Sequence, residues 1–373
     1  MTDTLHIVCL DAPSPPDYGG AIDMYYKIEA LAATGTKIIL HYFDYKIERN
    51  SFGLNDICKE VYAYKRNRHF IEHLKRKPYI VSSRINDDLV KRLNKDDLPV
   101  LFEGLHTTGI LPYLKNKKRK ILVRMHNNEA VYYQQLAKTE SNNILKKLYY
   151  KLESLKLESY QNQLDKNIPL GCISIADMNE FKSVGFTRAF HLPAFIPFSN
   201  VSIKSNTGDF CLYHGNLSIA ENSKVALWLI KHVFSTNSIP LVIAGRNIPH
   251  EVKSYAKPFS HISLIENPSN EEMDEFIINA QVHVLPSFNA TGVKLKLINA
   301  LLRGRHCIVN HQAVEGSELE PYCHIANTPS EFISFVRILM QKPIEVEEKE
   351  KRKEILEVYD NSKNARLINA YLQ

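Results

Sequence analysis

Two lysines, Lys294 and Lys296, lie close together in the segment SFNATGVKLKLINALLRG, residues 287–304. The segment follows AQVHVLP, whose alternating β-branched residues are typical of a buried strand, and the pattern predicts that the next helix begins at Gly292. The start of a helix offers unpaired N–H groups and roughly half a positive charge. Lysines there oppose the helix dipole, so they indicate an anion-binding site. The alternative is a lysine pair on a solvated helix face.

Asn299 and Arg303 are expected to share a helix face with Lys296, because residues three or four apart lie on one side of a helix. Thr291, just before the predicted helix, either belongs to the site or only caps the helix. The polar side of the helix is therefore expected to face the same ligand as the lysines.

Two further loops follow predicted strands, PPDYGG and RMHNNE. Gly19 and Gly20 are either turn glycines or residues that let a phosphate or sugar approach the backbone. His126 lies at the carboxyl end of KILVR, where α/β proteins bind ligands, although a lone histidine is more often structural. The motifs GxGxxG and GxxxxGK[ST] are absent, which argues against a nicotinamide dehydrogenase and a P-loop protein. No DxD triplet occurs, so no bound metal is expected.

The elements that position these loops alternate between short apolar strands and helices, which predicts parallel sheets covered on both faces. The alternation stops over residues 187–208, where prolines and small polar residues mark a domain boundary. We therefore predict an α/β protein of two tandem, Rossmann-like, doubly wound domains, 1–195 and 205–345, facing across a cleft. The terminal segment 350–373 is expected to be helical and to pack back on the first domain.

The chain has 373 residues and a net charge of +6, and its basic residues concentrate at 65–77 and 115–120. Such clusters favour anionic surfaces. Neither carries an aromatic-interleaved recognition motif, so nucleic acid is not an expected partner. Phe70, Ile71 and Leu74 lie inside the first cluster at helical spacing, either to enter a membrane interface or to fill a core.

Six cysteines are dispersed without a CxxC pair, and four lie in apolar strand-like runs, which is typical of reduced thiols in the cytoplasm. No run of about 18 apolar residues occurs in the sequence. We therefore expect a cytoplasmic protein whose membrane contact, if it has one, is peripheral, at the inner face of the cytoplasmic membrane.

The motifs PPDYGG, RMHNNEAVYYQQLA, ISIADMNEF, YHGNLSIAENSKVALWL, LVIAG and TGVKLKLINALLRG occur in this order. Together they resemble the GT-B glycosyltransferases of the large retaining family four, over nearly the whole chain. The resemblance implies a nucleotide-diphosphate sugar held mainly by the C-terminal domain and a glycan or lipid-linked acceptor held mainly by the N-terminal domain. It also implies transfer of a sugar, a hexose in this reading, with retention and without a metal or other cofactor.

From these loops and the resemblance together, we predict three groups of site residues. The catalytic group is His126, Lys294 and Lys296. The donor-binding group is Gly19, Gly20, Gly215, Asn216, Arg246, Thr291, Gly292, Val293 and Asn299. The group on the acceptor side is Glu103, Arg124, Asn127 and Glu129.

The chain departs from the family pattern at two places. Members of the family commonly carry two glutamates in the last motif, where this chain has Thr291 and Asn299. Many also carry an Arg and a Lys in the loop after the first strand of the second domain, where this chain has Asn216 and Asn222. Lys294 and Lys296 are expected to replace the missing cations at the donor diphosphate, while Asn299 hydrogen-bonds a ribose hydroxyl without adding negative charge. The alternative is a catalytically silent protein that binds a nucleotide or glycan or acts as an assembly partner.

Overall fold

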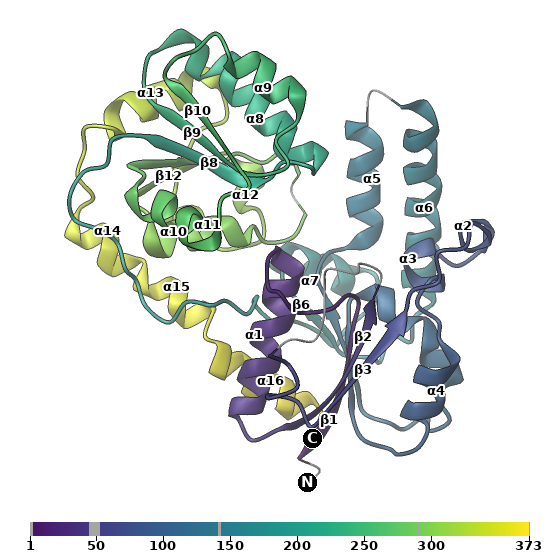
Figure 1. The fold of residues 1–373 in the computed structure, drawn as a ribbon. Coiled ribbons are helices and arrows are strands. Elements are labelled where there is room, and N and C mark those ends of the chain that lie inside the picture. Colours follow the sequence, from purple (N-terminus) through teal and green to yellow (C-terminus); the bar gives the residue numbers. More distant parts are fainter. Residues whose placement is uncertain (1–2, 45–52, 141–142, 290, 373) are drawn as a thin grey trace. The chain divides into compact units, whose positions relative to one another are not determined.

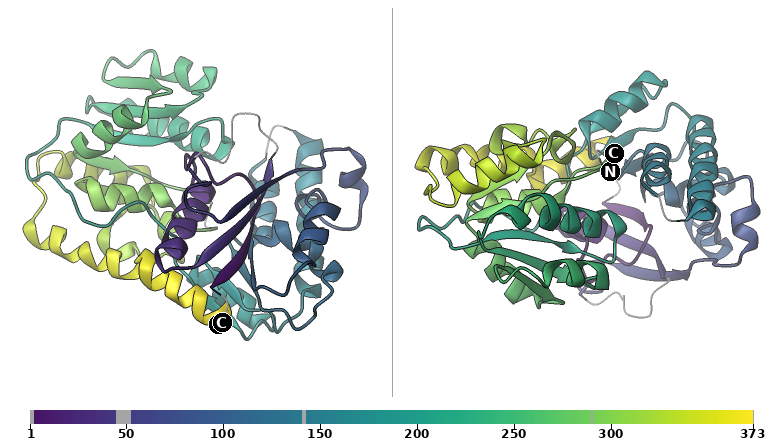
Figure 2. Two further views of the ribbon diagram at one scale, coloured as in Figure 1. Left: turned by 60° about the horizontal axis from the view of Figure 1, so that its bottom comes forward. Right: turned by 90° about the horizontal axis from the view of Figure 1, so that it is seen from above.

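The computed structural model describes residues 3–44, 53–140, 143–289 and 291–372 (Figure 1). It divides into two compact units, Met1–Pro197 with Tyr359–Gln373, and Phe198–Val358. The second unit thus extends beyond the expected 205–345, because the helices α14 (Val346–Lys351) and α15 (Lys353–Val358) belong to it. Of the expected terminal helix, only α16 (Asn361–Leu372) belongs to the first unit, where it packs on α1 (Gly19–Ala33) (Figure 2).

A seven-stranded parallel sheet forms the centre of the first unit in the described residues, in the order β3-β2-β1-β4-β5-β6-β7. Its strands are β1 (Thr4–Cys9), β2 (Lys37–Asp44), β3 (Glu60–Lys65), β4 (Val100–Glu103), β5 (Ile121–Met125), β6 (Leu170–Cys172) and β7 (Ala189–His191). The strand order reverses between β1 and β4, which in doubly wound sheets is the point where ligands bind.

Helices cover both faces of this sheet and bury an apolar core on each side. The helices of this unit, besides α1 and α16, are α2 (Ile71–Leu74), α3 (Tyr79–Ser82), α4 (Asp87–Leu93), the 3-10 helix η1 (Leu105–Tyr113), α5 (Glu129–Thr139), α6 (Ile144–Gln163) and α7 (Ile175–Ser183). Aliphatic strand residues point to both cores, which is why the strands read as continuous apolar runs in the sequence.

The second unit holds a six-stranded parallel sheet in the described residues, in the order β10-β9-β8-β11-β12-β13. Its strands are β8 (Cys211–Asn216), β9 (Leu241–Arg246), β10 (Ile262–Glu266), β11 (Val282–Val284), β12 (His306–Val309) and β13 (His324–Ile325). Its helices, besides α14 and α15, are α8 (Ala220–His232), η2 (Phe234–Thr236), α9 (His250–Ala256), α10 (Asn270–Asn279), α11 (Leu295–Arg303), α12 (His311–Val314), η3 (Glu320–Tyr322) and α13 (Pro329–Leu339). The prediction of an α/β protein with two doubly wound parallel sheets is confirmed. Within the described residues, no helix is both long and apolar enough to cross a bilayer.

The strands β8 and β9 approach closely at their carboxyl ends, where Gly215 and Gly245 are partners in register. A Cβ atom on Gly245 would lie 1.8 Å from the carbonyl oxygen of Gly215 and 2.6 Å from the side chain of Leu217. No side chain fits there without moving the backbone, so glycine at this position sets how the two strand ends meet.

We predict that Gly245→Ala lowers the free energy of unfolding by about 3 kcal/mol, because the methyl group collides with backbone that cannot rotate away. Gly35→Ala is the matched control: Gly35 has a φ of 86° with open space around it, so that only conformational strain of about 1–2 kcal/mol is expected. Urea unfolding measures both values. Equal losses in the two variants would contradict a packing role for Gly245.

Candidate functional site

The strands β8 and β11 are neighbours in the second sheet, so the helices that follow them start at the same edge. Lys296, in the first turn of α11, is half-buried beside α8. Its Nζ donates a hydrogen bond of 3.3 Å to Oδ1 of Asn222 and lies 4.8 Å from the centre of the Tyr213 ring. The ammonium group therefore rests on an amide oxygen and an aromatic face rather than on a carboxylate.

The charge of Lys296 is poorly compensated by the protein. Burial lowers the pKa of Lys296 to about 8, while the nearby Glu221 carboxylate raises it and Lys294 lowers it further. No ion pair involving Lys296 is present among the described residues. Such a lysine gains from an anionic ligand, which would restore its usual pKa.

The loop before α11 differs from the expectation. The helix begins at Leu295 with Lys294 at its N-cap, so neither Gly292 nor Thr291 starts or caps it. Gly292 has a φ of 66°, a left-handed conformation that glycine adopts without strain, and its role in the loop is that turn. Thr291 donates its hydroxyl to Asn289 Oδ1 over 2.8 Å, and Lys294 Nζ donates to the carbonyl of Thr291 over 2.6 Å.

The polar face of α11 carries an acceptor that lacks a partner. Oδ1 of Asn299 is buried and has no hydrogen-bond partner within the described part of the chain. A buried, unsatisfied amide oxygen is costly unless a ligand donates to it. Arg303 does not join this site, because its guanidinium pairs with Asp274 over 2.7 Å. Arg303 lies on α11 at the predicted spacing from Lys296 and Asn299, but Asp274 already compensates its charge.

The remaining residues predicted in this unit lie near the ends of β8 and β9. Asn216 and Arg246 are partners in register, and Arg246 is exposed. Oδ1 of Asn216 accepts hydrogen bonds from the backbone and hydroxyl of Ser218, so this side chain is engaged in its own turn. Gly215, near the end of β8, and Val293, in the loop before α11, are both half-buried.

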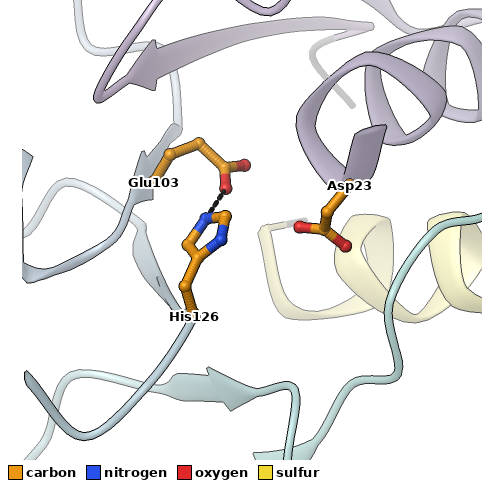
Figure 3. A group of neighbouring side chains, drawn as sticks. All are labelled: Asp23, Glu103 and His126. Carbon is orange, nitrogen blue, oxygen red and sulfur yellow. Dashed lines mark hydrogen bonds and ion pairs between the residues drawn. The ribbon is translucent and has the colours of Figure 1, made fainter. Parts of the chain in front are cut away.

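The first unit has a buried charge network at the edge formed by β4 and β5. Asp23 and Lys27, one turn apart on α1, pair over 2.7 Å, and Arg124 on β5 pairs with Asp23 over 2.8 Å. Lys27 also lies 3.0 Å from Glu103, whose second carboxylate oxygen lies 2.9 Å from Nε2 of His126. Figure 3 shows Glu103 and His126 pointing toward each other, with Asp23 across from them on α1.

The two carboxylates of the network are held ionised. Burial alone would raise the pKa of Asp23, but Arg124 and Lys27 outweigh it and hold that pKa well below its usual range. Burial also raises the pKa of Glu103. Lys27 and His126 outweigh it, so the pKa of Glu103 lies below its usual value. Two anions thus face two cations and an imidazole, so the buried charges balance.

Asp23, Glu103 and His126 also form a group that could hold a metal ion, since each offers one ligand atom and these atoms lie within 4.8 Å of one another. The ammonium group of Lys27, however, contacts both carboxylates. A divalent cation would have to displace Lys27 and leave its charge buried. The residues present therefore fit an ammonium–carboxylate network rather than a metal site.

The other residues predicted in the first unit differ in how far solvent reaches them. Arg124 is fully buried and also donates to the carbonyls of Leu192 and Pro193, so it supports the chain rather than facing solvent. His126 keeps about a tenth of its side chain exposed. Gly19 and Gly20 are the first two residues of α1, not part of the loop before it.

Comparison with known proteins places this geometry in a family. No family model matches the chain. The chain is 30% identical over 311 residues to an uncharacterized 44.6 kDa protein in a cps region of Klebsiella pneumoniae, and the match covers 79% of each chain. The structure is similar to sucrose-phosphate synthase from Thermosynechococcus elongatus, with a TM-score of 0.69, 14% identity and coverage of 98% and 97% of the two chains. It is also similar to a mutant of TarM from S. aureus in complex with fondaparinux, α-GlcNAc-glycerol and UDP, with a TM-score of 0.66, 10% identity and coverage of 99% of both chains.

The chain belongs to the family of the Klebsiella protein, and its fold is the GT-B fold of glycosyltransferases. The resemblance read from the sequence is thereby confirmed for the fold. In this GT-B chain, the lysine pair lies in the second unit and the histidine–carboxylate pair in the first.

Sequence reasoning missed two residues of the GT-B chain's second unit. Glu221, in the first turn of α8, accepts a hydrogen bond of 2.8 Å from the hydroxyl of Ser287, which follows β11. Glu221 is also the carboxylate that raises the pKa of Lys296. The signal was present, because Glu221 directly precedes Asn222 and Ser287 opens the lysine-bearing segment.

Glu129 is the first residue of α5 and is buried at the carboxyl end of β5. Burial raises its pKa to about 7, a hydrogen bond from Asn127 lowers it, and Asp177 raises it. The folded state therefore holds this proton up to about pH 7, whereas the unfolded chain releases it near the ordinary value of 4.5. Stability should accordingly fall as the pH rises from about 4.5 to about 7 and stay lower above that range.

We predict that Glu129→Gln raises the free energy of unfolding at pH 8 by about 1–3 kcal/mol and gives no gain at pH 4, because the amide needs no proton to stay neutral. Urea unfolding at the two pH values measures the effect. Glu158→Gln, at an exposed position on α6, is the control and should change neither value. A gain of equal size at both pH values would show that Glu129 does not carry the pH dependence.

Proposed function

We propose that the protein is a glycosyltransferase that moves a sugar from a nucleotide-diphosphate sugar to a glycan or lipid-linked acceptor. The observation that carries the proposal is Lys296, whose half-buried ammonium group, with Lys294 near it, lacks a carboxylate partner in the described residues. In a GT-B fold, the C-terminal sheet is where the resemblance places the donor. The TarM complex contains UDP, which supports a nucleotide donor for this chain.

The chemistry follows from where charge develops. As the glycosidic bond of the donor breaks, the departing nucleoside diphosphate gathers negative charge. A preorganised cation beside it stabilises the transition state more than the ground state. Lys294 and Lys296 supply this positive charge in our proposal, and we therefore propose transfer without a metal. The unsatisfied Oδ1 of Asn299 would accept a hydrogen bond from a ribose hydroxyl.

His126 is proposed to act at the acceptor or the donor sugar. Its Nε2 lies 2.9 Å from a fully buried Glu103 carboxylate, which fixes the ring. With the proton on Nε2, Nδ1 is left as an acceptor for a hydroxyl group. We propose that the sugar is a hexose transferred with retention, as the family resemblance implies.

We further propose that the protein works in polysaccharide biosynthesis in the cytoplasm. The relative in a cps region supports the pathway, and six free thiols, five of them buried, support a reducing compartment. A silent protein that binds nucleotide without transfer is the second candidate. It is favoured by Thr291 and Asn299, because the resemblance to retaining family four implies glutamates at these two positions.

Release of sugar from labelled UDP-, GDP- and ADP-sugars by the purified protein tests the proposal, with and without glycan acceptors. We predict turnover of one donor, and a loss of about 100- to 1,000-fold in Lys296→Ala with unchanged folding. Lys257→Ala, at an exposed position of the same unit, is the control. Binding of a nucleotide without turnover of any donor would favour the silent protein.

The pKa of Lys296 predicts a pH dependence. A lysine with a pKa of about 8 loses its charge as the pH rises through that value, so the affinity for a nucleoside diphosphate should fall above pH 8. Lys296→Arg should bind equally at pH 7 and pH 9, because a guanidinium stays charged. Calorimetric titration at the two pH values measures both affinities, and a wild-type affinity that is constant to pH 9 would remove Lys296 from the site.

A further inference from the structure

The helix α6 exposes an apolar stripe on the side opposite its buried face. Ile144, Leu145, Leu148, Leu152 and Leu155 are between 51% and 83% exposed, and their spacing places them on one side of the helix. The other side, which carries Glu153, Ser154, Leu157 and Gln161, is buried in the first unit. The buried side is mostly polar and the exposed side is apolar, the reverse of the usual pattern in a surface helix, so the exposed stripe indicates a binding surface.

Lysines border the stripe on both sides. Lys147 and Lys151, one turn apart, flank one side, and they have no ion pair among the described residues. Lys156 flanks the other side and pairs with Glu153 over 2.9 Å. Leucines with lysines at their edges are typical of a helix that lies in a membrane interface.

A second exposed apolar patch adjoins α6. Phe70, Ile71 and Leu74 are 75%, 63% and 70% exposed, so they do not fill a core. His73 on α2 connects this patch to α6. Its ring lies 5.6 Å from the ring of Tyr149 on α6, and α2 is drawn beside α6 in Figure 1. The same ring stacks on Tyr79 and lies 6.1 Å from the ring of Phe70.

A hydrogen bond fixes this neighbourhood, since Lys156 Nζ donates to the carbonyl of His73 over 2.8 Å. The two apolar patches therefore form one surface, which we name the α6–α2 face. The basic segment 65–77 surrounds its α2 part. The last residue of that segment is Lys77, and its Nζ lies 5.6 Å from the centre of the Tyr113 ring. Tyr113 comes just before the second basic segment, 115–120, in the sequence, so the two basic segments lie near each other.

Charge selects the partner of the α6–α2 face. In α6, Glu158 is exposed on the same border as Lys147 and Lys151, so pairing α6 with α6 of a second copy would leave an excess of positive charge along the contact. The stripe also covers about two heptads, fewer than the three or four that a coiled coil needs. An anionic bilayer offers both an apolar layer for the leucines and phosphates for the lysines.

We propose that the α6–α2 face binds the surface of an anionic lipid bilayer. The leucines of α6 and the side chains of Phe70, Ile71 and Leu74 enter the boundary between headgroups and acyl chains, and the flanking lysines and arginines pair with phosphates. This binding is independent of sugar transfer, so a failure of the proposed activity would leave it standing.

Co-sedimentation of the full chain with vesicles tests the proposal, using phosphatidylcholine alone and phosphatidylcholine with 30% phosphatidylglycerol. We expect binding to the anionic vesicles that weakens as salt is raised. Leu148→Gln/Leu152→Gln should weaken it about tenfold, and Lys147→Gln/Lys151→Gln about 10- to 30-fold. The matched controls, Ile338→Gln/Val346→Gln and Lys257→Gln/Arg337→Gln, change exposed positions of the second unit and should bind like the wild type.

Equal recovery with neutral and anionic vesicles would overturn the proposal, and so would binding that both α6 double variants retain. Sedimentation velocity adds a third decisive outcome. A wild-type dimer that Leu148→Gln/Leu152→Gln converts to a monomer would mean that a second copy, not a bilayer, covers the face. Because the four substituted positions are exposed, circular dichroism of the variants should match the wild type.

Discussion

The parallel direction of the strands is the constraint on which both candidate sites depend. Parallel neighbours end at the same edge of a sheet, so loops that are far apart in sequence meet there. Lys296 and Asn222 are 74 residues apart and touch because β8 and β11 are neighbours. Arg124 and Asp23 are 101 residues apart and touch because β4 alone separates β1 from β5.

The two sites treat buried charge in opposite ways. In the first unit, Asp23 and Glu103 are matched by Lys27 and Arg124, so the network is closed and supports the fold around His126. In the second unit, Lys296 rests on an amide and an aromatic ring, and burial lowers its pKa. A charge that the protein compensates only in part is the stronger indication of a ligand, because a bound anion recovers the remaining desolvation cost.

Both sheets were predictable from the sequence, because buried parallel strands read as short apolar runs between helices. The lysine pair was predictable as well, since lysines at a helix start are unusual. The start of α11 at Leu295 was not, because Gly292 serves a left-handed turn that looks like a helix boundary. The pairing of Arg303 with Asp274 and the contact of Ser287 with Glu221 depend on tertiary neighbours that no local pattern reveals.

Thermal unfolding in the presence of UDP, GDP and ADP, with the wild type and with Lys294→Ala/Lys296→Ala, tests the central claim most directly. A nucleotide at 100 times its dissociation constant stabilises a protein by about 2.7 kcal/mol. The account predicts that at least one diphosphate raises the melting temperature of the wild type and that none raises that of the double variant. A wild type that responds to no nucleotide, or a double variant that responds equally, would contradict it.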